Sequence, residues 1–132
     1  MLPRGLRQRA EAGSSTVELV IVFPLLLLCL LLVIQFAVWY HARHVALAAA
    51  EEGARAARVR TGTAAAGQAR AERFLRELGP TIVQTPRITA TRGLDQARVD
   101  VWGRAQPVVP WLRLPIHEAS QGPVERFRSP TE

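Results

Sequence analysis

The sequence predicts an α+β protein: a long amino-terminal helix that crosses a membrane, then a small domain with a second helix and a short antiparallel sheet. Three observations predict this architecture. The run from Leu19 to Tyr40 is apolar apart from Gln35. A helical pattern without proline continues from there to Arg60. From residue 97 onward apolar residues alternate with polar ones, which is the period of a half-buried strand.

The apolar run is long enough to span a bilayer. As a helix it extends about 33 Å, at about 1.5 Å per residue, and covers a hydrocarbon core of about 30 Å. A secretory signal peptide would have a shorter apolar core followed by small residues, whereas this run ends in Trp39 and Tyr40, which suit a membrane interface. A buried helix of a soluble domain is disfavoured by the length of the run. We therefore predict a transmembrane helix over residues 14–40, with a mild kink at Pro24.

An acidic residue stands where the apolar run begins. Glu18 is flanked by apolar residues, a costly position for a carboxylate that lacks a partner. Residues 1–13 form a short basic leader that ends in Gly13. Cleavage between Gly13 and Ser14 would create a positively charged amino group about one and a half helical turns from Glu18. Pairing of these two charges, within one chain or between neighbouring helices, would offset the cost of the carboxylate in apolar surroundings.

Gln35 is the strongly polar residue inside the apolar run. Two interpretations are open: its amide forms hydrogen bonds across a helix–helix interface, or it is a lone amide tolerated near the outer leaflet.

Residues 41–60 continue the helix, from Ser14 to Arg60 in all, and give it one face of small side chains. A small face lets another backbone approach closely, and either the domain's own sheet or a neighbouring subunit fills it; we favour the first. Glycine inside a helix costs about 1 kcal/mol relative to alanine, so its presence here indicates a close contact. The predicted helix-packing residues recur at three- and four-residue steps; they are Ala46, Ala49, Ala50, Gly53 and Ala57.

A second helix follows a break at residues 61–63. Thr63 suits the position that begins this helix, and Gly79-Pro80 suits its end. Its apolar residues lie at helical spacing and predict a buried stripe; they are Ala71, Phe74, Leu75 and Leu78.

The remainder of the domain has the composition of strands. Residues 81–85 and 87–92 are rich in Thr, Ile and Val, and 93–95 form a turn. Residues 97–105 then alternate, which predicts an antiparallel partner for 87–92 whose apolar face lies on the helix with the small-residue face.

Residues 107–116 are apolar but contain three prolines, so they cannot form a central strand. We expect a loop or edge segment with Trp111 packed over the core; insertion of Trp111 into a membrane surface or a neighbouring subunit is the alternative. A last short strand is expected over residues 117–120 or 124–127.

Composition and charge argue against several classes of function. The net charge is +6, and every basic residue is arginine. These arginines are scattered along the chain and form no nucleic-acid motif, so we expect no nucleic acid partner. We interpret the charge as solvated faces, with attraction to anionic lipid headgroups as an additional role. The single cysteine, Cys29, lies in the apolar run and cannot form an intrachain disulfide.

No catalytic constellation is present, and we expect neither an enzyme nor a bound cofactor. His41 and His44 stand three residues apart on one helix, but no carboxylate or thiol at a matching step completes a metal site. Interfacial side chains are the favoured interpretation of both histidines. Asp95 and Asp100 are expected in a turn and on the surface.

The residues around the expected cleavage site resemble a known family. The segment 13–19, GSSTVEL, is similar to the processing site of type IV prepilins: a basic leader, Gly, four residues, Glu and a long apolar helix. With Pro24 and the leucine run, and with AAAEEGARAA at 48–57, it resembles the TadE-like family, minor pseudopilins of the Tad (Flp) pilus of bacteria. The resemblance covers about residues 10–60. Glu51 stands where the family often has a different residue.

The resemblance implies a pilin-like fold and a role in assembly. A prepilin peptidase would cut after Gly13 on the cytoplasmic side, which places the domain of residues 41–132 outside the cell. Ser14 and Glu18 would direct helix packing with other pilins or pseudopilins and Tad assembly proteins, in a pilus or related secretion system. The localisation implied is the cell membrane, single-pass with a cytoplasmic amino terminus, with incorporation into a surface pilus as a further possibility.

Two other functions remain open. In the first, the chain is an uncleaved single-pass membrane protein that displays a small extracytoplasmic binding domain, and Glu18 then has no role in assembly. A small enzyme tethered to the membrane is the other, and it lacks candidate residues.

Overall fold

The computed structural model describes residues 4–126, with side chains from Thr16 onward. It divides the chain into two compact units, Met1–Ile34 and Gln35–Glu132. The predictions for the side chains of Gly13 and Ser14 therefore lie outside the described residues.

Helix α1 runs from Arg4 to Arg58 and contributes to both units. The sequence predicted Ser14 to Arg60, so both ends differ. The helix begins earlier because residues 6–12 consist of Leu, Arg, Gln, Ala and Glu, all good helix formers, and it continues through positions 14 and 15 without a break. It ends two residues earlier because the chain turns over residues 59–62, where the Gly62 amide donates to the Val59 carbonyl over 2.8 Å. Pro24 lies within the helix.

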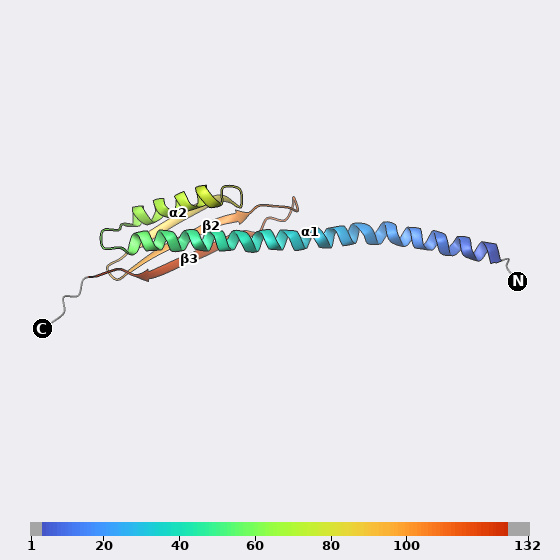
Figure 1. Cartoon of the computed structure of the whole chain (residues 1–132), viewed down its shortest axis with the longest axis horizontal. Helices are drawn as coiled ribbons and strands as arrows, with labels where there is room; N and C mark the ends of the chain where they lie inside the picture. Colours follow the sequence, from blue (N-terminus) through green and yellow to red (C-terminus); the bar gives the residue numbers. More distant parts are fainter. Residues whose placement is uncertain (1–3, 127–132) are drawn as a thin grey trace. The chain divides into compact units, whose positions relative to one another are not determined.

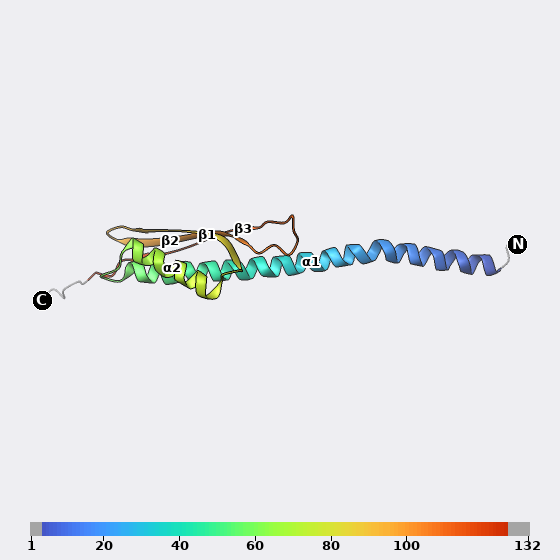
Figure 2. The ribbon, with the colours of Figure 1, turned by 90° about the horizontal axis from the view of Figure 1, so that it is seen from above.

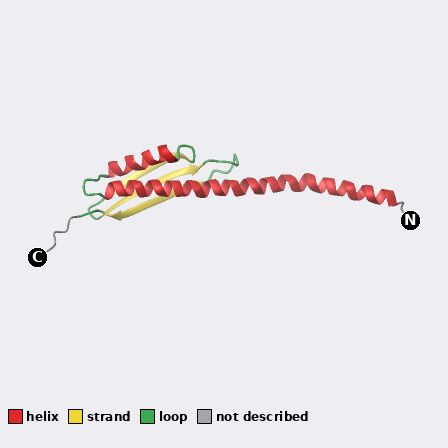
Figure 3. Cartoon of the chain, in the orientation of Figure 1, coloured by secondary structure: helices red, strands yellow, loops and turns green. Residues whose placement is uncertain are grey.

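The second unit has two layers. One layer is a three-stranded antiparallel sheet in the order β1-β2-β3, with β1 at Val83–Arg92, β2 at Gln96–Ala105 and β3 at Pro115–Pro123. The other layer is α2, Ala64–Leu78, beside the part of α1 that belongs to this unit. Figures 1 and 2 show both helices on one face of the sheet, and Figure 3 marks helices and strands by colour. The α+β class predicted from the sequence is confirmed.

The register of the sheet agrees with the expected hairpin and settles the last strand. Arg92 pairs with Ala97 next to the turn, and Ile88 pairs with Val101. Strand β3 pairs with β2 through Trp102 and His117, so the first of the two expected positions is correct, and the strand is longer than expected.

Strand β1 carries an irregularity where the sequence showed two separate runs. The register shifts between Gln84 and Arg87, around Pro86, and Thr85 has a φ of 46°. Proline cannot donate to a sheet ladder, and β1 is an edge strand, where such a bulge is tolerated.

The small-residue face of α1 forms one side of the core of the second unit, in agreement with the favoured interpretation. Ala46, Ala49, Ala50 and Ala57 are fully buried, and Gly53 is buried with them. A Cβ at Gly53 would lie 2.7 Å from the Gly67 carbonyl oxygen of α2 and 3.2 Å from the Val99 side chain of β2. Glycine is required here because one helix and one strand approach the same point of α1.

Helix α2 begins and ends where the sequence placed it. The Thr63 side chain accepts a hydrogen bond from the Ala66 amide over 3.0 Å, and the Gly79 amide donates to the Leu75 carbonyl over 2.9 Å. Two residues of the predicted stripe, Ala71 and Leu75, are buried together with Gly67, whereas Leu78 in the last turn is 58% exposed, so its predicted burial was wrong.

Candidate functional site

The first unit presents an apolar surface along its described side chains. Thr16 to Ile34 is exposed almost throughout, and no residue in the most apolar window of the helix is buried. By length and composition, this is the one helix among the described residues that is suited to cross a membrane. Large apolar side chains on every face of a helix require lipid or other apolar helices around them.

Glu18 is the single charged residue of that surface. Its side chain is exposed, and no described side chain from Thr16 to Arg126 forms an ion pair with it. The described residues therefore supply no partner for a carboxylate at the start of a membrane-spanning run, and a partner has to come from elsewhere.

Gln35, the first residue of the second unit, has a different role from either interpretation of the sequence. Its side chain is 0% exposed and binds the backbone of the segment between β2 and β3. Its Oε1 accepts from the amides of Val108 and Val109 over 2.6 and 3.0 Å. Its Nε2 donates to the Gln106 carbonyl over 3.3 Å. The expected helix–helix bond and the lone amide were both wrong, because the chain's own loop satisfies the amide.

Further side chains of α1 hold β3. The Trp39 indole donates to the Pro115 carbonyl over 3.1 Å. Arg43 forms an ion pair with Glu118 at 2.5 Å and lies over the Trp39 ring, 5.1 Å from its centroid. These contacts and those of Gln35 recur every four residues along α1, so one edge of the helix binds the segment from Gln106 to Glu118.

Residues 106–114 connect β2 to β3 as a loop, and its aromatic residue is exposed. Trp111 is 76% exposed, so the expectation that it packs over the core was wrong. Val109 is the buried residue instead, at 1%. The two Gln35 bonds hold the backbone at Val108 and Val109, and Val109 is the residue that lies inward.

Arg92, at the end of β1, binds the other end of α1. Its guanidinium donates to the carbonyls of Ala57 and Val59 over 2.7 and 2.9 Å, and to the carbonyl of Gly62. A cation at the carboxyl end of a helix satisfies carbonyls that lack a helical partner and interacts favourably with the helix dipole. No sequence pattern predicts this contact, because an arginine at a strand end is an ordinary surface residue.

The outer face of the sheet carries a polar cluster. Arg98 donates to both carboxylate oxygens of Asp100 over 2.7 and 2.8 Å, and the His117 Nε2 lies 3.0 Å from Asp100. The Arg98 hydrogen bond is the main reason that the pKa of Asp100 lies below its ordinary value; His117 acts in the same direction, and partial burial opposes both. The His117 ring stacks on Trp102, with centroids 4.8 Å apart. Asp100 thus lies on the surface, as expected, but in a satisfied network.

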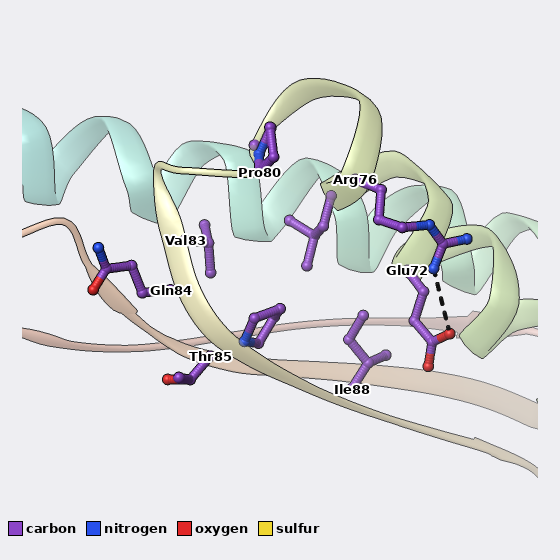
Figure 4. Close-up of a pocket in the computed structure, with 10 residues that line it drawn as sticks. Glu72, Arg76, Pro80, Val83, Gln84, Thr85 and Ile88 are labelled. Atoms are coloured by element: carbon purple, nitrogen blue, oxygen red, sulfur yellow. Dashed lines mark ion pairs between the residues drawn. The ribbon is translucent and has the colours of Figure 1, made fainter.

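A hollow of about 670 Å³ lies between α2 and β1. Figure 4 shows Val83 and Ile88 on its strand side and the Glu72–Arg76 ion pair, 4.0 Å, at its helix side. The bulge of β1 at Pro86 helps to line it. The lining is mainly apolar, and its charged groups already have each other as partners. Sequence reasoning did not anticipate this hollow.

Nothing among the described residues makes a metal site, since no group of three or more His, Cys, Asp and Glu side chains is suitably placed. The two histidines of α1 do not cooperate: His44 packs edge-on against Tyr40, with ring centroids 4.4 Å apart, and His41 is exposed.

Comparison with known proteins supports one family. Searches of curated proteins and of solved structures give no significant match. The family model described as TadE-like protein matches residues 13–55, about a third of the chain. This match begins at Gly13 and includes Glu18, the apolar run and the small-residue face as far as Gly53. It associates the chain with the Tad pilus in general, and residues 13–55 are thus a TadE-like segment, as the sequence resemblance predicted.

Proposed function

We propose that this chain is the precursor of a minor pilin or pseudopilin of a Tad (Flp) pilus or related secretion system. A prepilin peptidase cuts it between Gly13 and Ser14, on the cytoplasmic side of the membrane. The mature protein then assembles through its apolar helix with other pilins and Tad assembly proteins, while the domain of residues 41–132 lies outside the cell. The role is structural and not catalytic.

The observation that carries the proposal is Glu18. It begins a helical surface that is apolar on all sides, it has no partner among the described residues, and it lies within the TadE-like match. The amino group that cleavage would create on Ser14 is the nearest source of positive charge in the mature chain, and one helix offers it to its own Glu18 or to that of a neighbour. Assembly would therefore provide the partner that the described residues do not supply.

The test is the amino-terminal sequence of the protein in its native membrane, determined by mass spectrometry with and without the prepilin peptidase. We expect Ser14 as the first residue when the peptidase is present and Met1 when it is deleted. A working protein that retains its leader in the presence of the peptidase would contradict the proposal and favour the uncleaved, domain-displaying alternative.

A pair of variants separates insertion from assembly. Glu18→Ala leaves the apolar run intact, so we expect normal membrane insertion and loss of piliation. Glu18→Asp keeps the charge and is the matched control, which should retain part of the assembly. Wild-type piliation in the Glu18→Ala strain would exclude a role for this carboxylate.

A further inference from the structure

The loop of residues 107–114 carries the largest exposed aromatic side chain among the described residues of the second unit. Trp111 is 76% exposed although its backbone is held by the loop's attachment to Gln35. A single exposed indole is ordinary on a protein surface, so a contact here has to be supported by the place of this fixed loop along α1 and by the residues beside it.

The attachment of this loop to Gln35 fixes its level along α1. A transmembrane helix needs about 20 residues, so a span that begins after Glu18 extends to about residue 38. Gln35 lies before that limit, and its side chain is fully buried by the backbone of Val108 and Val109. A loop that binds the helix at this residue is therefore at the depth where the bilayer ends.

The same level of α1 carries the side chains expected at a membrane interface. Phe36 and Tyr40 are 53% and 61% exposed, and the Trp39 indole binds the Pro115 carbonyl that follows the loop. Aromatic residues with one polar edge gather where headgroups meet acyl chains. Trp111 adds a residue from the loop between β2 and β3 to these aromatic side chains of α1.

The charge of the segment also suits a lipid surface. Between Asp100 and Glu118 the chain contains Arg104 and Arg113, both exposed, and no acidic residue. Basic side chains next to a membrane surface are attracted to anionic headgroups.

We propose that residues 107–114 form a second membrane contact, in which Trp111 lies in the interface of the leaflet where the transmembrane helix ends and Arg113 lies among its headgroups. The partner is a lipid surface. The contact rests on membrane anchoring of the chain and not on pilus assembly, so it holds for the single chain in a bilayer.

The experiment uses the full chain in vesicles of phosphatidylcholine and phosphatidylglycerol. In the Trp39→Phe/Trp102→Phe background, Trp111 is the only tryptophan. The matched control removes Trp111 by Trp111→Phe and adds Leu94→Trp, because Leu94 is 84% exposed in the turn between β1 and β2, at the opposite end of the sheet. Lipids with brominated acyl chains should quench most of the Trp111 emission and little of the emission from position 94, whereas iodide in the water should do the reverse.

Two results would overturn the contact with lipid. Equal quenching of both positions by iodide would show that the loop lies in water. Protection of Trp111 from both iodide and brominated lipid would show that protein covers it, a second copy being the candidate. Carbonate extraction of the same vesicles checks that the chain is embedded, so failed anchoring is distinguished from a failed loop contact.

A second measurement avoids changing Trp39, which helps to hold β3. In a Cys29→Ala chain, a nitroxide label is placed by Trp111→Cys or, as control, by Leu94→Cys. We expect the label at 111 to collide more often with oxygen than with a water-soluble nickel chelate, and the label at 94 to show the opposite order. The same order at both positions contradicts the proposal.

Discussion

Both parts of helix α1 are helical, yet their side chains have opposite surroundings. From Thr16 to Ile34 the side chains are mostly large, and they are exposed. From Gln35 to Arg58 the inward residues are mainly alanine with one glycine, and they are buried. The difference shows that a face of small residues lets a strand and a second helix approach the helix backbone closely, whereas large apolar side chains on all faces require apolar surroundings.

The comparison can be tested most strongly where the two parts meet. Gln35→Ala removes the acceptor of two backbone amides and leaves them without a partner in the protein. Each orphaned buried donor costs about 1–3 kcal/mol, so we expect the largest loss of domain stability and detachment of residues 106–109. Thermal unfolding in detergent and limited proteolysis of the loop measure both effects. A variant as stable as the wild type would show that the amide does not hold the loop.

The small-residue face is the next place to test. Gly53→Ala should destabilise the domain by about 1–3 kcal/mol through overpacking against Gly67 and Val99, although alanine is favoured in a helix by about 1 kcal/mol. Gly93→Ala is the matched control, since its Cβ would meet only the Gln96 carbonyl oxygen at 3.6 Å. Leu26→Ala, in the exposed part of α1, should leave unfolding of the domain unchanged. Unfolding by denaturant compares the three, and a neutral Gly53→Ala would contradict the close contact.

A smaller effect is expected at the carboxyl end of α1. Arg92→Ala removes the cation that binds the last carbonyls, and we expect a loss of about 1–2 kcal/mol with faster hydrogen exchange over residues 55–62. Arg92→Lys keeps the charge but donates from one point, so it should restore part of the stability. Unchanged exchange in Arg92→Ala would show that solvent replaces the guanidinium without cost.

The smallest effect is expected from pH at the outer face of the sheet. The pKa of Asp100 is lower in the folded chain than in the unfolded one, where carboxyl pKa values are about 3.9. The stabilisation is therefore complete above that value and is lost as the pH falls through the folded pKa. Asp100→Asn should flatten the decline of the unfolding temperature below about pH 4. An identical acid profile in both proteins would mean that the network contributes nothing.

Patterns local in sequence were sufficient for much of this fold. The alternation at 97–105, the Thr63 cap and the steps of the small-residue face depend on neighbours one to four residues away, and the structure confirms all three. The predicted start of α1 was wrong. A serine suits the first position of a helix, but the helix extends further toward the amino terminus when the preceding residues are themselves good helix formers.

Contacts between distant residues were beyond sequence patterns. Gln35 binds residues more than seventy positions away, and Arg92 binds carbonyls about thirty positions away. Nothing local distinguishes these side chains from any other glutamine or arginine. Trp111 was misplaced for the same reason: its exposure follows from the anchoring of its loop to Gln35. The side chains of Gly13 and Ser14 lie outside the described residues, so the cleavage site remains a prediction.

Residues 35–58 of α1 are bound to the rest of the second unit near both ends, through Gln35 at one end and through Arg92 at the other. A force along the axis of this helix would load the Gln35 and the Arg92 hydrogen bonds at the same time. The packed helical turns between them would have to slide together across the sheet. Separation would then require shear of the whole contact and not the peeling of one turn after another. A chain fastened in this way would keep its domain folded under tension along the helix.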